Sequence, residues 1–237
     1  MNAISGIPKS VGAFLRAGPE HYREWVMRRQ LNLLIYCLGA IAMGAGLFGA
    51  AMGGWRDGLQ AVYTGIKLPL VMLLTTLGNG LLNGMLAPLL GLNVTFRQSL
   101  AVVLMTFAVS AMVLGALSPV VWFVVWNTPP LTTGTSLSSP EYGFLQLTLA
   151  VFIALAGVLG NVRLLPLLRQ WTGNAATARN VLLAWLAVNL FLGSQIAWVL
   201  RPFIWDPSHP VEFIGREYFH GSFFETIFHA VGRLIFS

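Results

Sequence analysis

Charged residues are scarce in this chain. Lys, Arg, Asp and Glu make up 9% of its 237 residues, whereas soluble domains usually contain about 25%. Between Leu31 and Leu200 only eight charged residues occur, and they fall in the gaps between long apolar runs or, for Arg163, at the edge of one. This scarcity excludes a soluble domain of appreciable size and predicts a polytopic membrane protein.

Cysteine is almost absent as well, since Cys37 stands alone in an apolar run. A single cysteine excludes a disulfide within the chain and gives no zinc or redox motif. The net charge of +6 is interpreted through the preference of basic residues for the cytoplasmic side of a membrane, and it does not indicate nucleic-acid binding.

Motifs that carry catalysis are also missing. The sequence has no GxGxxG, phosphate-binding loop, HExxH or GxSxG pattern. No ionisable residue lies at the centre of an apolar run, although proton relays and ion-coupled pumps normally need one there. We therefore expect no enzyme activity, no metal and no cofactor. The histidines are interpreted as surface residues, with a metal or tetrapyrrole ligand as the alternative; they are His21, His209, His220 and His229.

What the chain does contain is five long apolar runs. Each approaches or exceeds the roughly 20 residues that a helix needs to cross about 30 Å of hydrocarbon. Backbone groups in lipid have to be satisfied within their own segment, so helices are predicted for all five. The runs are residues 31–53, 68–90, 100–126, 144–165 and 181–200. The predicted fold is an all-α membrane helix bundle with amphipathic interfacial helices at both ends.

The predicted organisation has three parts: a basic N-terminal segment 1–30, a five-helix transmembrane domain 31–200 and an aromatic outer part 201–237. With the N-terminus in the cytoplasm, the inner segments hold nine Lys and Arg residues and the outer segments hold five. This bias predicts a protein of the inner (cytoplasmic) membrane with a cytoplasmic N-terminus and an outer C-terminus. The tryptophans near the boundaries divide in the same way: Trp25 and Trp171 inside, and Trp55, Trp122, Trp126, Trp198 and Trp205 outside.

Two connecting segments are predicted to lie on the membrane surfaces. Residues 59–66, before the second run, have the apolar spacing of a short amphipathic turn on the outer surface. The inner loop after the fourth run carries Arg163, Arg169 and Arg179. These arginines form a patch suited to anionic lipid headgroups.

Small residues recur every four positions in the first run. Gly49 and Gly53 form a GxxxG pair, and Gly46 and Ala50 form a second small pair beside it. This spacing lets a neighbouring helix approach closely. Packing within the chain is the main interpretation, and a seam between two copies is the alternative.

Four side-chain amides lie inside apolar runs. Asn79 and Asn83 are four residues apart, so they share one face of the second predicted helix. Asn189 and Gln195 lie in the fifth run. One interpretation is hydrogen bonding between helices. The other is a polar lining for the path of a small solute or lipid.

The end of the last run marks a membrane boundary. Arg201-Pro202 stops the predicted helix, and Trp198 and Trp205 flank it where lipid gives way to water. The guanidinium of Arg201 is expected to reach the outer interface. There it would meet carbonyl groups left unpaired at the helix end, an acidic side chain or a lipid headgroup.

The C-terminal tail is predicted to form an amphipathic helix in the outer interface. Ser222 and Glu225 have the spacing of a capping box. At about 100° per residue, the apolar side chains of the tail cover an arc of roughly 140°. That face comprises Phe223, Phe224, Ile227, Phe228, Val231, Leu234 and Ile235. The alternative is that the same face docks onto a partner subunit.

Two stretches resemble an uncharacterised family of bacterial polytopic membrane proteins. They are YTGIKLPLVMLLTTLGNGLLNGML followed by TFRQSL, and GSQIAWVLRPFIWDP followed by VEFIGREYFHGSFFETI. That family ends in a W-V-L-R-P-F segment and an aromatic tail, and the likeness covers most of the chain from Tyr63 onward. In topology, the basic N-terminus and five runs also resemble the Ypt-interacting (Yip) family of trafficking proteins. Neither resemblance implies catalytic residues.

The sequence favours a non-catalytic integral membrane protein, either a scaffold or an accessory subunit of a larger membrane complex. The alternative is a facilitator or channel for a small solute or lipid, lined by Asn79, Asn83, Asn189 and Gln195. An intramembrane enzyme is the third and least supported hypothesis. The expected partners are the lipid bilayer and either other membrane subunits or further copies of the chain, and not nucleic acid.

Overall fold

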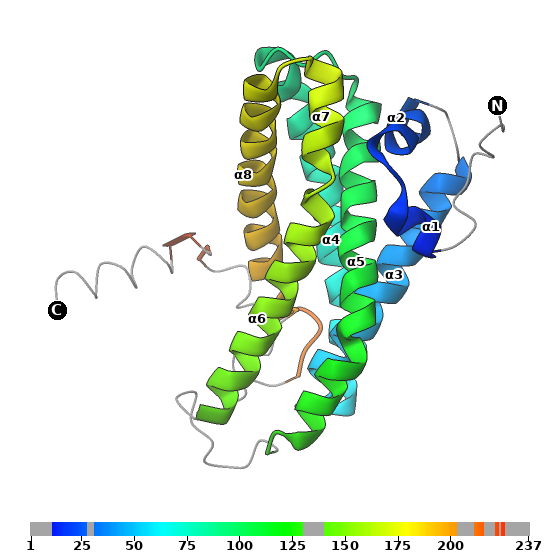
Figure 1. Ribbon diagram of the computed structural model, residues 1–237. Helices are drawn as coiled ribbons and strands as arrows, with labels where there is room; N and C mark the ends of the chain where they lie inside the picture. The colour runs from blue at the N-terminus through cyan, green and yellow to red at the C-terminus, as the bar shows by residue number, and fades with distance from the viewer. Residues whose placement is uncertain are drawn as a thin grey trace.

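The regular structure in the described part of the chain is helical throughout. The computed structural model describes residues 11–27, 31–129, 140–202, 211–215, 221–222 and 224–225. In chain order (Figure 1), the elements are α1 (Val11–Arg16), α2 (Pro19–Met27), α3 (Leu31–Gly53), α4 (Gly58–Leu89), α5 (Phe96–Asn127), α6 (Pro140–Asn161), α7 (Leu164–Thr172) and α8 (Ala175–Leu200). The prediction of an all-α fold is confirmed.

Five helical stretches are long and apolar enough to cross a membrane. They are α3, α4, α5, the stretch Gly143–Thr172 that joins most of α6 to α7, and α8. Each matches one of the five apolar runs, so the predicted number and order of long apolar helices are confirmed. In Figure 1 the connections 90–95 and 173–174 lie at the top and the connection 54–57 lies towards the bottom. We call these the upper end and the lower end of the bundle.

Helix α4 begins ten residues before the predicted start at residue 68. The Asp57 carboxylate caps it by accepting a hydrogen bond from the Gly58 N–H at 2.7 Å. Next in the helix, the buried Gln60 side chain donates to the Thr64 hydroxyl at 3.1 Å. The prediction of a separate surface turn over residues 59–66 is wrong, because this cap and this buried pair extend α4 through that segment.

The connection between the fourth and fifth apolar runs is also more helical than predicted. It contains α7, which buries Leu164, Leu167 and Leu168. The helix ends at Gly173, whose φ of 63° lies in the left-handed region that glycine adopts without strain. Helix α8 then begins six residues earlier than residue 181, because the Asn174 side chain accepts a hydrogen bond from the Ala176 N–H at 2.8 Å.

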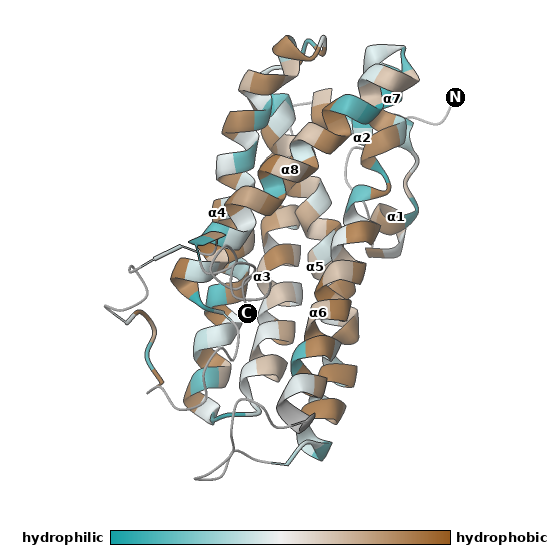
Figure 2. Cartoon of the chain, turned by 90° about the vertical axis from the view of Figure 1, so that its left-hand side faces the viewer, coloured by the Kyte–Doolittle hydropathy of each residue, from teal (hydrophilic) through white to brown (hydrophobic). Residues whose placement is uncertain are grey.

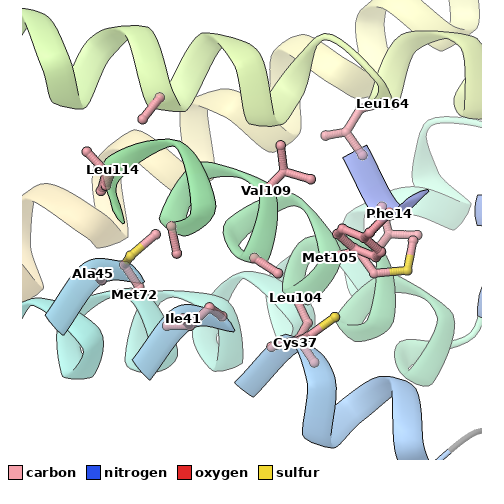
Figure 3. Packing of buried hydrophobic residues seen from close by; sticks show 14 of the residues in the cluster. Phe14, Cys37, Ile41, Ala45, Met72, Leu104, Met105, Val109, Leu114 and Leu164 are labelled. Carbon is pink, nitrogen blue, oxygen red and sulfur yellow. The ribbon is translucent and has the colours of Figure 1, made fainter. Parts of the chain in front are cut away.

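The core of the bundle lies among α3, α4 and α5, whose buried side chains meet in Figure 3. Ile41, Ala45 and Phe48 of α3 are fully buried. The opposite side of α3 exposes large apolar residues such as Met43 and Leu47, and apolar residues also predominate along α5 and α6 (Figure 2). Helices that are apolar on their buried and exposed sides alike are typical of membrane spans.

The small residues of α3 let it lie directly against the backbone of α4. A Cβ atom on Gly49 would come within 2.5 Å of the Thr64 carbonyl oxygen, and one on Gly53 within 2.6 Å of the Gln60 carbonyl oxygen. A Cβ atom on Gly46 would lie 3.3 Å from the Gly65 carbonyl oxygen. The predicted glycine seam is therefore occupied within the chain, by α4.

Helices α1 and α2 pack on the bundle through a cluster of aromatic residues. The rings of Phe14 and Trp25 are stacked with centroids 5.5 Å apart, and Tyr22 lies 5.7 Å from Phe14. Arg163, in the break between α6 and α7, donates to the Phe14 carbonyl oxygen at 3.2 Å and to the Tyr22 hydroxyl at 3.1 Å. Burial raises the pKa of Tyr22 although Arg163 opposes this shift, so at neutral pH its hydroxyl is protonated. Arg163 thus contacts the N-terminal helices, whereas the predicted headgroup patch needed it on the surface.

The short described parts of the C-terminal region lie against α4 and α8. Phe213 meets Tyr63 edge-on, with ring centroids 5.4 Å apart. Further on, the Ser222 hydroxyl accepts a hydrogen bond from the Glu225 N–H at 3.1 Å, which is the cap that the sequence predicts. The ring of Phe224 stacks on Phe191 of α8 at 4.9 Å. The other residues predicted for the tail face and for the outer boundary, Trp205, Phe223, Ile227, Phe228, Val231, Leu234 and Ile235, lie outside the described residues.

Replacing Gly49 with alanine is expected to lower the thermal midpoint of unfolding in detergent by about 5 °C. The added Cβ would overlap main-chain atoms of α4, and overpacking of this kind costs about 1–3 kcal/mol, with about 2–4 °C for each kcal/mol in a chain of this size. Gly39→Ala is the matched control, because a Cβ atom added to Gly39 of the same helix would meet no other atom within 4 Å. Equal midpoints for the two variants would contradict the close α3–α4 contact.

Replacing Arg163 with glutamine is expected to loosen α1 and α2 from the bundle. Hydrogen bonds of charged groups contribute about 1.5–3 kcal/mol, so amide hydrogen exchange in residues 11–27 should become at least about tenfold faster. Arg169→Gln is the control, because Arg169 is exposed near the end of α7. If both variants keep the protection of the unchanged protein, Arg163 does not hold the N-terminal helices.

Candidate functional site

A groove between α6 and α8 has the features of a ligand site. Helix α6 packs chiefly on α5, while α8 packs on α4 and α7. Helices α6 and α8 therefore make few direct contacts with each other. The space between them has a volume of about 470 Å³, with α4 and α5 as its floor. Pockets of about 300–1,000 Å³ are typical of small-molecule sites.

Small residues give this groove its width. Gly157 and Ala156 line it from α6, and Gly193 and Ala197 line it from α8. A Cβ atom on Gly157 would meet no other atom within 4 Å, so the groove is empty of protein at that point. Asn189, Gly193 and Ala197 are spaced four residues apart and therefore follow one face of α8.

The upper end of the groove is closed by asparagines. The Asn79 side-chain amide donates to the Asn189 side-chain oxygen at 2.7 Å, which joins α4 to α8. Asn83 and Asn161 lie beside this pair around a small pocket of about 20 Å³, which is room for about one water molecule. The side-chain oxygens of Asn79 and Asn83 are buried and have no hydrogen-bond partner in the described residues.

Most hydroxyl groups along the groove are satisfied by the backbone of their own helix. Thr106 donates to the Val102 carbonyl oxygen at 3.0 Å, and Ser110 donates to the Thr106 carbonyl oxygen at 3.2 Å. Thr75 differs from them. It is 1% exposed and lines the groove, but its hydroxyl oxygen has no partner among the described residues. A buried polar atom without a partner costs about 1–3 kcal/mol, so Thr75 has a hydrogen bond to offer to a ligand or to water.

The lower end of the groove is formed by Trp198, Arg201 and Pro202. The guanidinium of Arg201 lies over the Trp198 ring, 5.0 Å from its centroid. Arg201 closes α8 in the left-handed conformation, with φ 42° and ψ 62°, and its N–H donates to the Ala197 carbonyl oxygen at 2.8 Å. Such a φ is uncommon for any residue other than glycine, and it is the only positive φ of a non-glycine residue in the described part of the chain.

Three of the four predicted polar lining residues come together and the fourth does not. Asn79, Asn83 and Asn189 surround the upper end of the groove. Gln195 is absent from the groove lining, because six residues of helix rotate it by about 240° from Asn189. The four residues thus do not line one continuous path. The three asparagines instead form the closed end of a groove whose long sides are apolar.

Four residues of this region were not predicted as site residues from the sequence: Lys67, Thr75, Asn161 and Gly157. Lys67 is 1% exposed inside α4, and its ammonium group donates to the Glu212 carbonyl oxygen at 3.3 Å and lies 5.4 Å from the centroid of the Phe213 ring. A signal for two of these residues was available. Lys67, Val71, Thr75, Asn79 and Asn83 are each four residues apart, so they form one stripe along α4.

The described lining of the groove offers groups that can bind a ligand, but it contains no combination of acids, bases or metal ligands that is typical of catalysis. Arg201 is the only charged residue in its described lining. The described residues contain no group of three His, Cys, Asp or Glu side chains that could hold a metal ion. Asparagine, serine and threonine side chains donate and accept hydrogen bonds but are poor acids and bases at neutral pH. The arrangement can therefore hold and orient an apolar molecule that has polar groups.

Comparison of the chain with protein-family models, with curated proteins and with solved structures gives no match. The resemblance to a bacterial polytopic membrane family, and the likeness in topology to the Yip family, therefore stay predictions.

Proposed function

We propose that this chain is a multi-pass integral membrane protein that binds a chain of a lipid in the groove between α6 and α8 and does not transform it. The groove itself is the observation that carries this proposal. It lies between two of the long apolar helices and is walled mainly by apolar residues. Its opening between α6 and α8 would face the bilayer, so a lipid could enter it from the side.

The walls of the groove favour a lipid chain, because they are mainly apolar and enclose a volume of about 470 Å³. A narrow flexible chain fits such a space, and it also suits apolar walls that offer few hydrogen bonds. A small polar solute fits less well, because Gln195 does not line the groove and α7 packs on α8 above the asparagines.

The proposed role is that of a non-catalytic scaffold or accessory subunit, in association with other membrane proteins or further copies of the chain. The facilitator hypothesis is retained as a second candidate in a narrower form, for a lipid instead of a small solute. Its support is the lateral opening of the groove, since a lipid handled there need not cross the protein. The two roles share the same lipid site and differ in whether the lipid stays bound.

The proposed orientation has a cytoplasmic N-terminus and an outer C-terminus in the inner (cytoplasmic) membrane. The nine-to-five division of basic residues supports it. The upper end of the bundle is then cytoplasmic and the lower end faces outward. Large exposed aromatic residues at the lower end of α5, Trp122, Phe123 and Trp126, fit the aromatic belt that forms at a membrane boundary.

Filling the groove is expected to remove the bound lipid. In Gly157→Phe the added Cβ atom meets no other atom within 4 Å, and the ring is expected to occupy the groove. Lipid retained after purification in mild detergent should therefore fall about tenfold, which corresponds to about 1.4 kcal/mol. Gly143→Phe is the matched control on α6, since Gly143 has open space around it and does not line the groove. Equal amounts of lipid in both variants, measured by quantitative mass spectrometry, would contradict the proposed site.

The orientation can be tested by labelling single cysteines from each side of the membrane, in a variant without Cys37. Ser138→Cys lies in the connection between α5 and α6, and a membrane-impermeant thiol reagent should label it in intact cells. Ala175→Cys is exposed at the start of α8, and it should react only after the membrane is opened. Labelling of position 175 in intact cells would reverse the proposed orientation.

A further inference from the structure

The charge at the lower end of the groove indicates which class of lipid it holds. We propose that the groove selects a lipid with an anionic headgroup, which Arg201 binds at the lower end while one hydrocarbon chain extends upward past Thr75. This inference rests on the proposed lipid-binding function and adds the charge and the direction of the ligand.

The described lining of the groove carries charge of one sign. Arg201 is the only charged residue in it, so the described lining is positive at its lower end. Lys67 adds a second positive charge in the same region, close enough to interact electrostatically with Arg201. Charges at the edge of an apolar region interact more strongly than in water, because the local dielectric constant is lower.

The backbone and the neighbours of Arg201 hold its guanidinium at this place. A residue before proline normally prefers extended conformations, yet Arg201 is left-handed. Its guanidinium rests on Trp198, which itself lines the groove. Strained backbone of this kind persists where the surrounding structure over-determines it, which is frequent at ligand sites. A planar guanidinium is also well shaped to bind the oxygens of a phosphate group in pairs.

The length of the groove matches one hydrocarbon chain of one leaflet. Its lining on α8 extends from Asn189 to Arg201, about 18 Å at 1.5 Å per residue. Half of the hydrocarbon thickness of a bilayer is about 15 Å. A headgroup at Arg201 would thus place the end of the chain near the asparagines that close the groove. Thr75 lies along this path, among the residues that line the groove.

The test compares two phospholipids that differ only in headgroup. The protein is reconstituted in bilayers of equal amounts of dioleoyl phosphatidylglycerol and dioleoyl phosphatidylcholine and is then extracted in mild detergent. The lipid that co-purifies should be enriched in phosphatidylglycerol by about tenfold over the bilayer ratio. Arg201→Gln should lose this enrichment and Arg201→Lys should keep part of it. Arg56→Gln, a change of a basic residue at the same end that does not line the groove, should keep all of it.

The outcomes separate the two proposals. Equal retention of both phospholipids, lost in Gly157→Phe, would overturn the anionic selectivity and leave the lipid groove. Retention of neither phospholipid by the unchanged protein would overturn both. Displacement of phosphatidylglycerol by excess inorganic phosphate would also overturn the inference, because it would indicate a site for a free anion. If Arg201→Gln does not fold, Arg201→Gly removes the charge and adopts the left-handed backbone without strain, and enrichment that persists in this variant would equally overturn it.

Discussion

The close approach of α3 to the backbone of α4 is the contact on which the rest of the bundle depends. In a bilayer, lipid chains are as apolar as leucine, so helices associate through dense van der Waals packing rather than through the hydrophobic effect. Gly49 and Gly53 place α3 against the main chain of α4, and Gly44 lies where any Cβ would overlap the Ala111 carbonyl group of α5. One glycine-rich helix thereby joins two neighbours and forms a dense three-helix core.

The groove follows from how the remaining helices attach to this core. Helix α6 packs mainly on α5, and α8 packs mainly on α4 and on α7. Helix α7, which follows α6, packs on α8 at the upper end, and below it the small residues of α6 and α8 line the groove from its two sides. The hydrogen bond from the Asn79 side chain to the Asn189 side chain attaches α8 to α4, and it also closes the upper end of the groove. One polar interaction thus supports the architecture and limits the length of the site.

Arg163 and Arg201 both enter the count of basic residues that predicts the orientation, but they have different structural surroundings. Arg163 lies in the break between α6 and α7 and donates to Phe14 and Tyr22 of the N-terminal helices. Arg201 follows the last turn of α8 and lies on Trp198 at the mouth of the groove. Both occupy interruptions of an apolar helix, where backbone carbonyl groups and water are within reach of a charged side chain. A count of basic residues on each side of a membrane treats them alike.

The sequence by itself determined the class of fold, the order of the long helices and several local features. Apolar length and backbone satisfaction in lipid leave little choice but helices. The GxxxG spacing of α3 and the shared face of Asn79 and Asn83 are properties of one helix, and so is the hydrogen bond between Ser222 and Glu225. All of these depend on residues within about four positions of one another, so periodicity was enough to predict them.

Only the tertiary structure decided which of these faces meet. Helical spacing could place Thr75 in line with Asn79, but it could not say that Gly193 of α8 lies opposite, with its Cβ position 3.5 Å from Thr75. Nor could it exclude Gln195 from the groove or bring Arg163 to Tyr22. Weak local signals, such as the Asp57 cap that lengthens α4, also escaped a search for apolar runs. The physical reason is that a face is set by contacts three and four residues apart, whereas its partner is chosen by packing among segments far apart in the chain.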